Sequence, residues 1–221
     1  IGTALTDSPV VRKLSFTGST SVGKILTRNC ADTMKKISME LGGNAPFIVF
    51  DDADLDSAVS GALISKFRNT GQTCVCSNRI LVQEGIYDEF VTRLADAVKT
   101  LNVGNGMEDG INQGPLISQK ALDQVKDHIS DAIDRGAVIV AGGKPHHSGG
   151  TMFEPTVISN VDSSMKVASE ETFGPLAPIF KFSTEQEAID MANDTEFGLA
   201  SYFYTSNVNR IWRVSEALEY G

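Results

Sequence analysis

The sequence predicts an α/β fold, in which a largely parallel, Rossmann-like sheet is flanked by helices. Short apolar runs alternate with stretches of helical periodicity along the 221 residues. This alternation is typical of parallel strands joined by helical crossovers. No internal repeat and no long linker interrupts the pattern.

Each element follows from its local sequence. Strands are expected where short apolar runs stop at turn residues, and helices where apolar residues recur every three or four positions. The expected strands are 11–16, 36–39, 46–50, 79–83, 137–141, 155–158, 179–182 and 200–204. The expected helices are 20–31, 55–67, 86–101, 118–135, 185–192 and 208–218. Asp54 is a suitable N-cap for the helix that begins at Leu55, and Gly136 a suitable end for the helix before it. The stripe of the helix over 55–67 comprises Leu55, Val59, Ala62, Leu63 and Phe67.

Composition narrows the class of protein. Apolar residues make up 41%, as in ordinary globular proteins, and the net charge is -9. An acidic chain argues against a nucleic-acid partner, and no apolar run approaches the about 20 residues that cross a membrane. Three cysteines are too few for a disulfide scaffold, so we expect the cytoplasm or, in a eukaryote, the mitochondrial matrix. The three histidines have no metal-site spacing, so no metal is expected. The chain starts at Ile1 without a Met, and we expect it to be part of a longer protein.

The segment 67–76 places a cation, a Gly-Gln turn and two thiols within ten residues. A thiol attacks as the thiolate, which a nearby positive charge favours, and a glycine lets a ligand or another backbone approach. Cys74 is therefore a candidate nucleophile, with Arg68 as the cation. The alternative is that Cys74 and Cys76 are small buried apolar residues.

Gly18 to Lys24 follows an expected strand and opens an expected helix. Such a turn offers backbone N–H groups to an anion, typically phosphate. It nearly matches a nucleotide-binding P-loop, but Ile25 stands where that motif needs the Ser or Thr that binds magnesium. The alternatives are a P-loop-like nucleotide-binding protein and an ordinary strand-to-helix connection.

Two further segments carry carboxylates. Glu40 stands between Met39 and Leu41, and a carboxylate among apolar neighbours is a candidate general base; the alternative is a solvent-facing strand end. In Glu170–Leu176, a carboxylate can accept hydrogen bonds from ribose hydroxyls, and Phe173 can pack against a flat heterocycle. The alternative there is a solvated acidic turn with Phe173 in the core.

Together, in this order, the segments 16–23, 39–44, 71–74 and 170–175 resemble the aldehyde dehydrogenase superfamily. The resemblance covers nearly the whole chain, and the segments 68–76 and 174–178 look most like its succinate-semialdehyde dehydrogenase branch. It implies that residues 1–42 are the C-terminal part of an NAD(P)-binding domain. Residues 43–221 would be the catalytic domain, incomplete at its C-terminal end. The full-length protein would be a homo-dimer or homo-tetramer that uses NAD or NADP.

The resemblance also implies a role for each candidate residue. Cys74 would attack the aldehyde, its N–H would hold the oxyanion, and Glu40 would activate the water that hydrolyses the thioester. Arg68 would bind the distal carboxylate of succinate semialdehyde, although it could instead only cap a helix C-terminus. Cys76 would pair with Cys74 in a redox switch, or serve only in packing. The residues implied at the cofactor are Gly18, Ser19, Thr20, Ser21, Val22 and Gly23 at the pyrophosphate, Leu41 at the nicotinamide amide, Glu171 at the ribose and Phe173 near the ring.

The implied reaction is oxidation of succinate semialdehyde to succinate. Another carboxylated aldehyde or a neutral aldehyde is the alternative within the family. Outside it stands a catalytically incomplete segment that keeps only the fold. The family takes a second oxyanion donor and most of its adenosine site from residues upstream of the matching part, so we expect little turnover from residues 1–221 alone.

Overall fold

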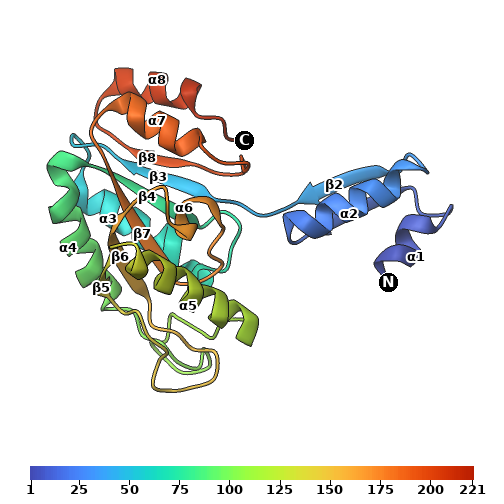
Figure 1. Cartoon of the computed structure of the whole chain (residues 1–221), viewed down its shortest axis with the longest axis horizontal. Coiled ribbons are helices and arrows are strands. Elements are labelled where there is room, and N and C mark those ends of the chain that lie inside the picture. Colours follow the sequence, from blue (N-terminus) through green and yellow to red (C-terminus); the bar gives the residue numbers. More distant parts are fainter. The chain divides into compact units, whose positions relative to one another are not determined.

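The computed structural model describes all residues, 1–221, and divides them into two compact units, Ile1–Gly42 and Gly43–Gly221 (Figure 1). Both units consist of strands and helices in alternation, so the predicted α/β class is confirmed. No helix is long and apolar enough to span a bilayer. No group of three or more His, Cys, Asp or Glu side chains could hold a metal ion.

The small unit contains two strands and two helices: α1 (Gly2–Asp7), β1 (Lys13–Thr17), α2 (Thr20–Ala31) and β2 (Lys36–Glu40). The strands are parallel, and Thr17 at the end of β1 lies opposite Glu40 at the end of β2. Leu14, Leu26 and Cys30 form the small core between α2 and the strands. Because both strands end at the same edge, the residues that follow each strand are neighbours.

The large unit is built on a six-stranded sheet of order β5-β6-β7-β4-β3-β8. All neighbouring strands are parallel except the β5–β6 pair at one edge. The strands are β3 (Ala45–Val49), β4 (Ser77–Gln83), β5 (Val138–Ala141), β6 (Thr156–Val161), β7 (Leu176–Phe182) and β8 (Tyr202–Tyr204). The sheet is therefore largely parallel, as predicted, with one antiparallel edge strand.

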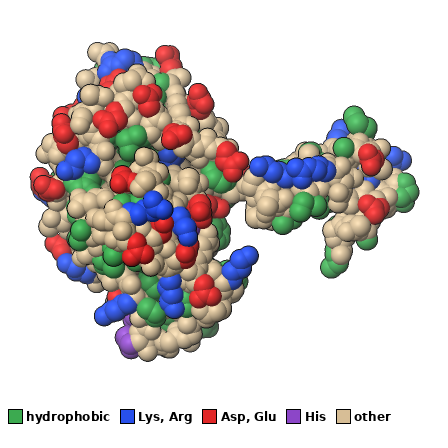
Figure 2. Space-filling model, viewed as in Figure 1, with side chains coloured by type: hydrophobic (Ala, Val, Ile, Leu, Met, Phe, Trp, Pro, Cys, Tyr) green, Lys and Arg blue, Asp and Glu red, His purple; other side chains and the backbone are tan.

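Helices cover both faces of this sheet (Figure 1). Successive β3 residues alternate between the faces: Phe47 and Val49 join one core cluster, while Ile48 joins the other. The first face is covered by α3 (Leu55–Phe67) and α4 (Tyr87–Val98). The second is covered by α5 (Gln119–Asp134), α6 (Lys166–Ser169), α7 (Glu185–Asn193) and α8 (Val208–Ala217). On the outside, acidic and basic side chains are interspersed over the visible face of this unit (Figure 2).

Every expected strand and helix overlaps with an element of the structure. The sequence did not predict α1, α6 and the two 3₁₀ turns η1 (Arg68–Gly71) and η2 (Glu84–Ile86). These elements have three to six residues. Elements this short span one or two turns, so they leave little periodicity to detect.

Candidate active site

Three candidate segments of the large unit meet at one edge of its sheet. Gly43 precedes β3, Cys74 precedes β4 and Glu171 precedes β7. These strands are parallel neighbours, in the order β7-β4-β3, so their amino ends share an edge. Residues far apart in the sequence are thereby brought together.

The turn before Cys74 has an unusual backbone. After α3 ends at Phe67, the residues Asn69, Thr70 and Gly71 have φ values of 51°, 57° and 72°. This region is costly for a β-branched residue such as Thr70. Gly71 is required because a Cβ there would overlap with the carbonyl oxygen of Gly174. The close approach of another backbone, expected from the glycine, is thus made by the segment before β7.

Residues 113–117 hold this turn from outside. The Thr70 hydroxyl donates to the Gly114 carbonyl at 3.2 Å and accepts from the Gly114 N–H at 3.0 Å. Gln113 Nε2 donates to the carbonyl of Phe67 at 2.9 Å. The Gln72 side chain accepts from the Ile117 N–H at 2.9 Å. These bonds explain how three successive residues are kept in the left-handed region.

The two thiols of this segment differ in environment. Cys74 is half-buried and Cys76 is fully buried, and both are free. The Cys76 Sγ lies 3.8 Å from the Arg68 carbonyl oxygen, and its N–H donates to Thr73 at 2.9 Å. Cys76 therefore packs inside the loop, while Cys74 retains access to solvent.

Gly43 connects the Cys74 and Glu171 segments. Its N–H donates to Glu171 Oε1 at 3.0 Å, and its Cα faces the Cys74 carbonyl. Burial raises the pKa of the Glu171 carboxyl, while the Gly43 N–H and the Lys66 charge act in the opposite direction. Glu171 and Phe173 are both half-buried, so Phe173 is not a core residue.

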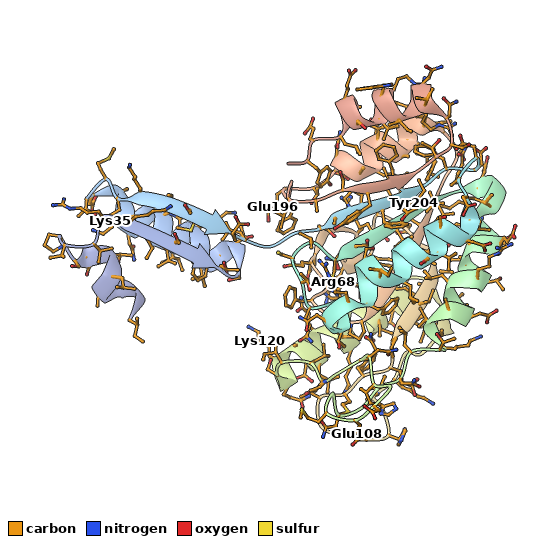
Figure 3. All side chains as sticks on the ribbon, turned by 180° about the vertical axis from the view of Figure 1, so that it is seen from behind. Lys35, Arg68, Glu108, Lys120, Glu196 and Tyr204 are labelled. Atoms are coloured by element: carbon orange, nitrogen blue, oxygen red, sulfur yellow. The ribbon has the colours of Figure 1, made fainter.

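Arg68 is the exposed residue that directly follows α3, where it forms the C-cap (Figure 3). Its backbone N–H donates to the Ile64 carbonyl, but its guanidinium has no hydrogen-bond or ion-pair partner in the chain. Tyr202 of β8 donates its hydroxyl to the Val75 carbonyl at 2.8 Å. Burial raises the pKa of Tyr202, and the charge of Arg68 opposes this, so Arg68 lies within electrostatic range of β8.

In the small unit, the turn 18–23 and the end of β2 lie side by side. The Gly18 N–H donates to the Glu40 carbonyl at 3.0 Å, and the Thr20 hydroxyl accepts from the Gly42 N–H at 3.4 Å. A Cβ on Gly23 would overlap with the Leu41 side chain. The Glu40 side chain is exposed, so the small unit itself does not bury the carboxylate. Glu40 and Cys74 belong to different units.

Several residues that build this site escaped the sequence analysis: Lys66, Thr70, Asn78, Gln113, His128, Thr172 and Tyr202. Lys66 alone carried a local signal, because it follows Val59 and Ala62 at helical spacing on the buried side of α3. The others are brought in by the order of the strands, which a local pattern does not contain.

A model of the aldehyde dehydrogenase family matches residues 1–221. The chain belongs to this family. The chain aligns over its full length with 3-sulfolactaldehyde dehydrogenase of Pseudomonas putida (63% identity) and glutarate-semialdehyde dehydrogenase of Pseudomonas aeruginosa (61%). It likewise aligns with the succinate-semialdehyde dehydrogenase [NADP(+)] of Escherichia coli (58%). It covers 46% of each of these proteins.

A solved structure has the same fold. The succinate-semialdehyde dehydrogenase of Burkholderia pseudomallei superposes with a TM-score of 0.99, at 59% identity, over all of this chain and 46% of that one. The aldehyde dehydrogenase chain thus spans less than half the length of the relatives it matches. Family membership excludes the P-loop interpretation of Gly18 to Lys24. The relatives are named for three different aldehydes, so their names do not identify the substrate.

Proposed function

We propose that the whole protein oxidises an aldehyde with a distal anionic group, with succinate semialdehyde as the first candidate, using NAD+ or NADP+. The observation that carries this proposal is Arg68: an exposed guanidinium without a partner, in the same loop as Cys74. A guanidinium offers forked, charge-assisted hydrogen bonds to a carboxylate. In this proposal the 1–42 unit is the end of the cofactor domain and the 43–221 unit most of the catalytic domain.

Cys74 would act as the nucleophile. Its thiolate adds to the aldehyde carbon, and the carbonyl oxygen becomes an oxyanion that accepts a hydrogen bond from the Cys74 N–H. The bound dinucleotide supplies the acceptor for the hydride that leaves this carbon. Glu40 then takes a proton from the water that hydrolyses the remaining thioester, which releases the acid and restores the Cys74 thiolate.

The residues present suit a dinucleotide. Gly18, Ser19 and Ser21 at the start of α2 are exposed, and the first turn of this helix has no acidic residue to repel a pyrophosphate. Glu171 Oε1 accepts from Gly43, which leaves Oε2 for a ribose hydroxyl. Gly18 to Gly23, Leu41, Glu171 and Phe173 would hold the dinucleotide.

A second substrate class is favoured by the same observation. One relative is named for 3-sulfolactaldehyde, whose sulfonate is also an anion. The Arg68 guanidinium suits a sulfonate as well as a carboxylate, and glutarate semialdehyde carries its carboxylate one carbon further away. The test below therefore measures the preference for an anionic group before it ranks the anions.

The experiment is nicotinamide reduction by the full-length protein with succinate semialdehyde and with butanal, a neutral aldehyde of the same length. Arg68→Ala should lower kcat/KM for succinate semialdehyde roughly ten- to a hundredfold and leave butanal nearly unchanged, because a charge-assisted bond is lost. Arg93→Ala, at another exposed arginine on α4, is the matched control, and Cys74→Ala is the blank. Equal losses on both aldehydes would discard the substrate assignment and keep the dehydrogenase.

A further inference from the structure

The segment between α6 and β7, which carries Glu171, has no regular secondary structure. Its position depends on Thr172, which is only 1% exposed. The Thr172 N–H donates to Asn78 Oδ1 at 3.3 Å, and its carbonyl accepts from Lys66 Nζ at 3.4 Å. Its hydroxyl is 2.8 Å from His128 Nδ1. Every polar group of Thr172 thus has a buried partner.

Lys66 is the centre of these contacts. Its side chain is fully buried, although it belongs to α3 rather than to the segment that it holds. Its ammonium also donates to Asn78 Oδ1 at 3.1 Å. Lys66, Asn78 and Thr172 therefore bond pairwise, directly beneath the backbone of Glu171.

Lys66 contributes a charge as well as hydrogen bonds. Burial lowers the pKa of Lys66 to about 8, against the opposite influence of Cys76 and Glu171. The side chain is therefore mainly protonated at neutral pH. Its positive charge in turn opposes the effect of burial on the pKa of the Glu171 carboxyl. A buried ammonium without hydrogen-bond partners or a counter-charge would be costly.

We propose that Lys66 is a positioning residue for dinucleotide binding. Its ammonium fixes the Thr172 backbone and places a positive charge near the adjacent Glu171 carboxylate, which is thereby oriented toward the ribose hydroxyls. This inference rests on the proposed role of Glu171. Two cations near the end of α3 then have different roles. The buried Lys66 positions the residue that binds the dinucleotide, and the exposed Arg68 binds the anionic group of the aldehyde.

The first test measures dinucleotide binding directly, by calorimetric titration of the full-length protein with NAD+ and with NADP+. Lys66→Met keeps most of the length of the side chain and removes the ammonium, and it should raise the Kd roughly ten- to a hundredfold. The KM for the aldehyde should stay near the wild-type value. Lys126→Met, at an exposed position of α5, is the matched control and should change neither. An unchanged Kd in a folded Lys66→Met protein, or an equal rise in the aldehyde KM, overturns the proposal.

The second test starts from the wild-type protein. The wild-type Kd should rise between pH 7 and pH 9, as Lys66 loses its proton. The other titratable groups around it are Cys76 and Glu171, together with His128 and Glu170 on the far side of Thr172. Cys76→Ser removes the neighbouring thiol and should retain the rise. A Kd that is constant over this range, or a rise that disappears in Cys76→Ser, overturns the assignment to Lys66.

Glu171→Gln distinguishes a failure of the Lys66 inference from a failure of the proposed role of Glu171. If this variant binds the dinucleotide as tightly as the wild type, the proposed role of Glu171 is wrong, and the inference fails with it. If Glu171→Gln weakens binding and Lys66→Met does not, only the role of Lys66 is wrong. Weaker binding in both variants, with Lys126→Met unchanged, supports both.

Discussion

The Cα of Gly43 lies directly against the backbone carbonyl of Cys74, so closely that a Cβ on residue 43 would overlap with this oxygen. The same glycine donates its N–H to Glu171 at 3.0 Å. Two candidate residues separated by almost a hundred positions are therefore aligned by one residue without a side chain. In the sequence, Gly43 is only the second glycine of a Gly-Gly pair.

Gly43→Ala should displace the Cys74 backbone and with it the N–H that would hold the oxyanion. A displacement of about 1 Å at a reacting group can cost roughly a hundredfold in rate, so we expect kcat to fall by this order. The measurement is steady-state turnover of the full-length protein. Gly106→Ala is the control, because a Cβ there meets nothing within 4 Å. Similar kcat values in the two variants would show that the contact does not position Cys74.

Thr70 offers a test of the left-handed turn. Thr70→Val keeps the β-branched shape at φ 57° but leaves the N–H and carbonyl of Gly114 without their partner. Loss of these bonds should favour local opening by about 1–3 kcal/mol. Amide hydrogen exchange of the segment 68–76 should accelerate accordingly. Thr70→Ser retains the hydroxyl and should exchange no faster than the wild type; acceleration in both variants would assign the effect to packing.

The elements were largely predictable because their periodicity is local. The helices over 20–31 and 55–67 occupy the residues that the sequence indicated. The antiparallel direction of β5 was not predictable, since the apolar run 137–141 indicates a strand but not its direction. Strand order is also non-local, and only the order β7-β4-β3 shows why residues before three different strands share one edge.

The candidate site was predictable where the chemistry is unusual for its surroundings, as with the thiols beside Arg68. Apart from Lys66, the residues that orient the site gave no such signal. Lys66 lies on a helix face that the pattern reserves for apolar side chains, and its partners Asn78 and Thr172 are 12 and 106 positions away. The contacts that orient a site are therefore less visible in the sequence than the groups that react.

The proposed switch at Cys76 predicts reversible inactivation by hydrogen peroxide. Oxidation would join Cys74 to Cys76, the two thiols giving up two protons and two electrons while peroxide is reduced to water. Cys76 would have to leave its buried place beside the Arg68 carbonyl. Activity lost in peroxide should return with dithiothreitol, and Cys76→Ser should lose this recovery, whereas Cys30→Ser should keep it. A Cys76→Ser protein that is inactivated as fast and as reversibly as the wild type contradicts the switch.

His128 predicts a pH dependence of stability. The ring is fully buried, with Nδ1 2.8 Å from the Thr172 hydroxyl and Nε2 3.2 Å from Glu170. A neutral ring satisfies both contacts, because Nδ1 accepts from the hydroxyl and Nε2–H donates to the carboxylate. Burial lowers the pKa of His128 below its ordinary value of 6.5, and Glu170 opposes this shift only in part.

The direction in which stability changes with pH follows from the number of protons that the folded and unfolded chains bind. Below pH 6.5 the unfolded chain takes up a proton that folded His128 resists, so the free energy of unfolding falls as the pH falls. The contribution is fully present above pH 6.5 and is lost as the pH falls through the lowered folded pKa, with a slope of at most about 1.4 kcal/mol per pH unit. Urea titrations between pH 5 and 7.5 measure it. His128→Gln should reduce the slope and the exposed His147→Gln should not; equal slopes in all three proteins would assign the acid sensitivity to other groups.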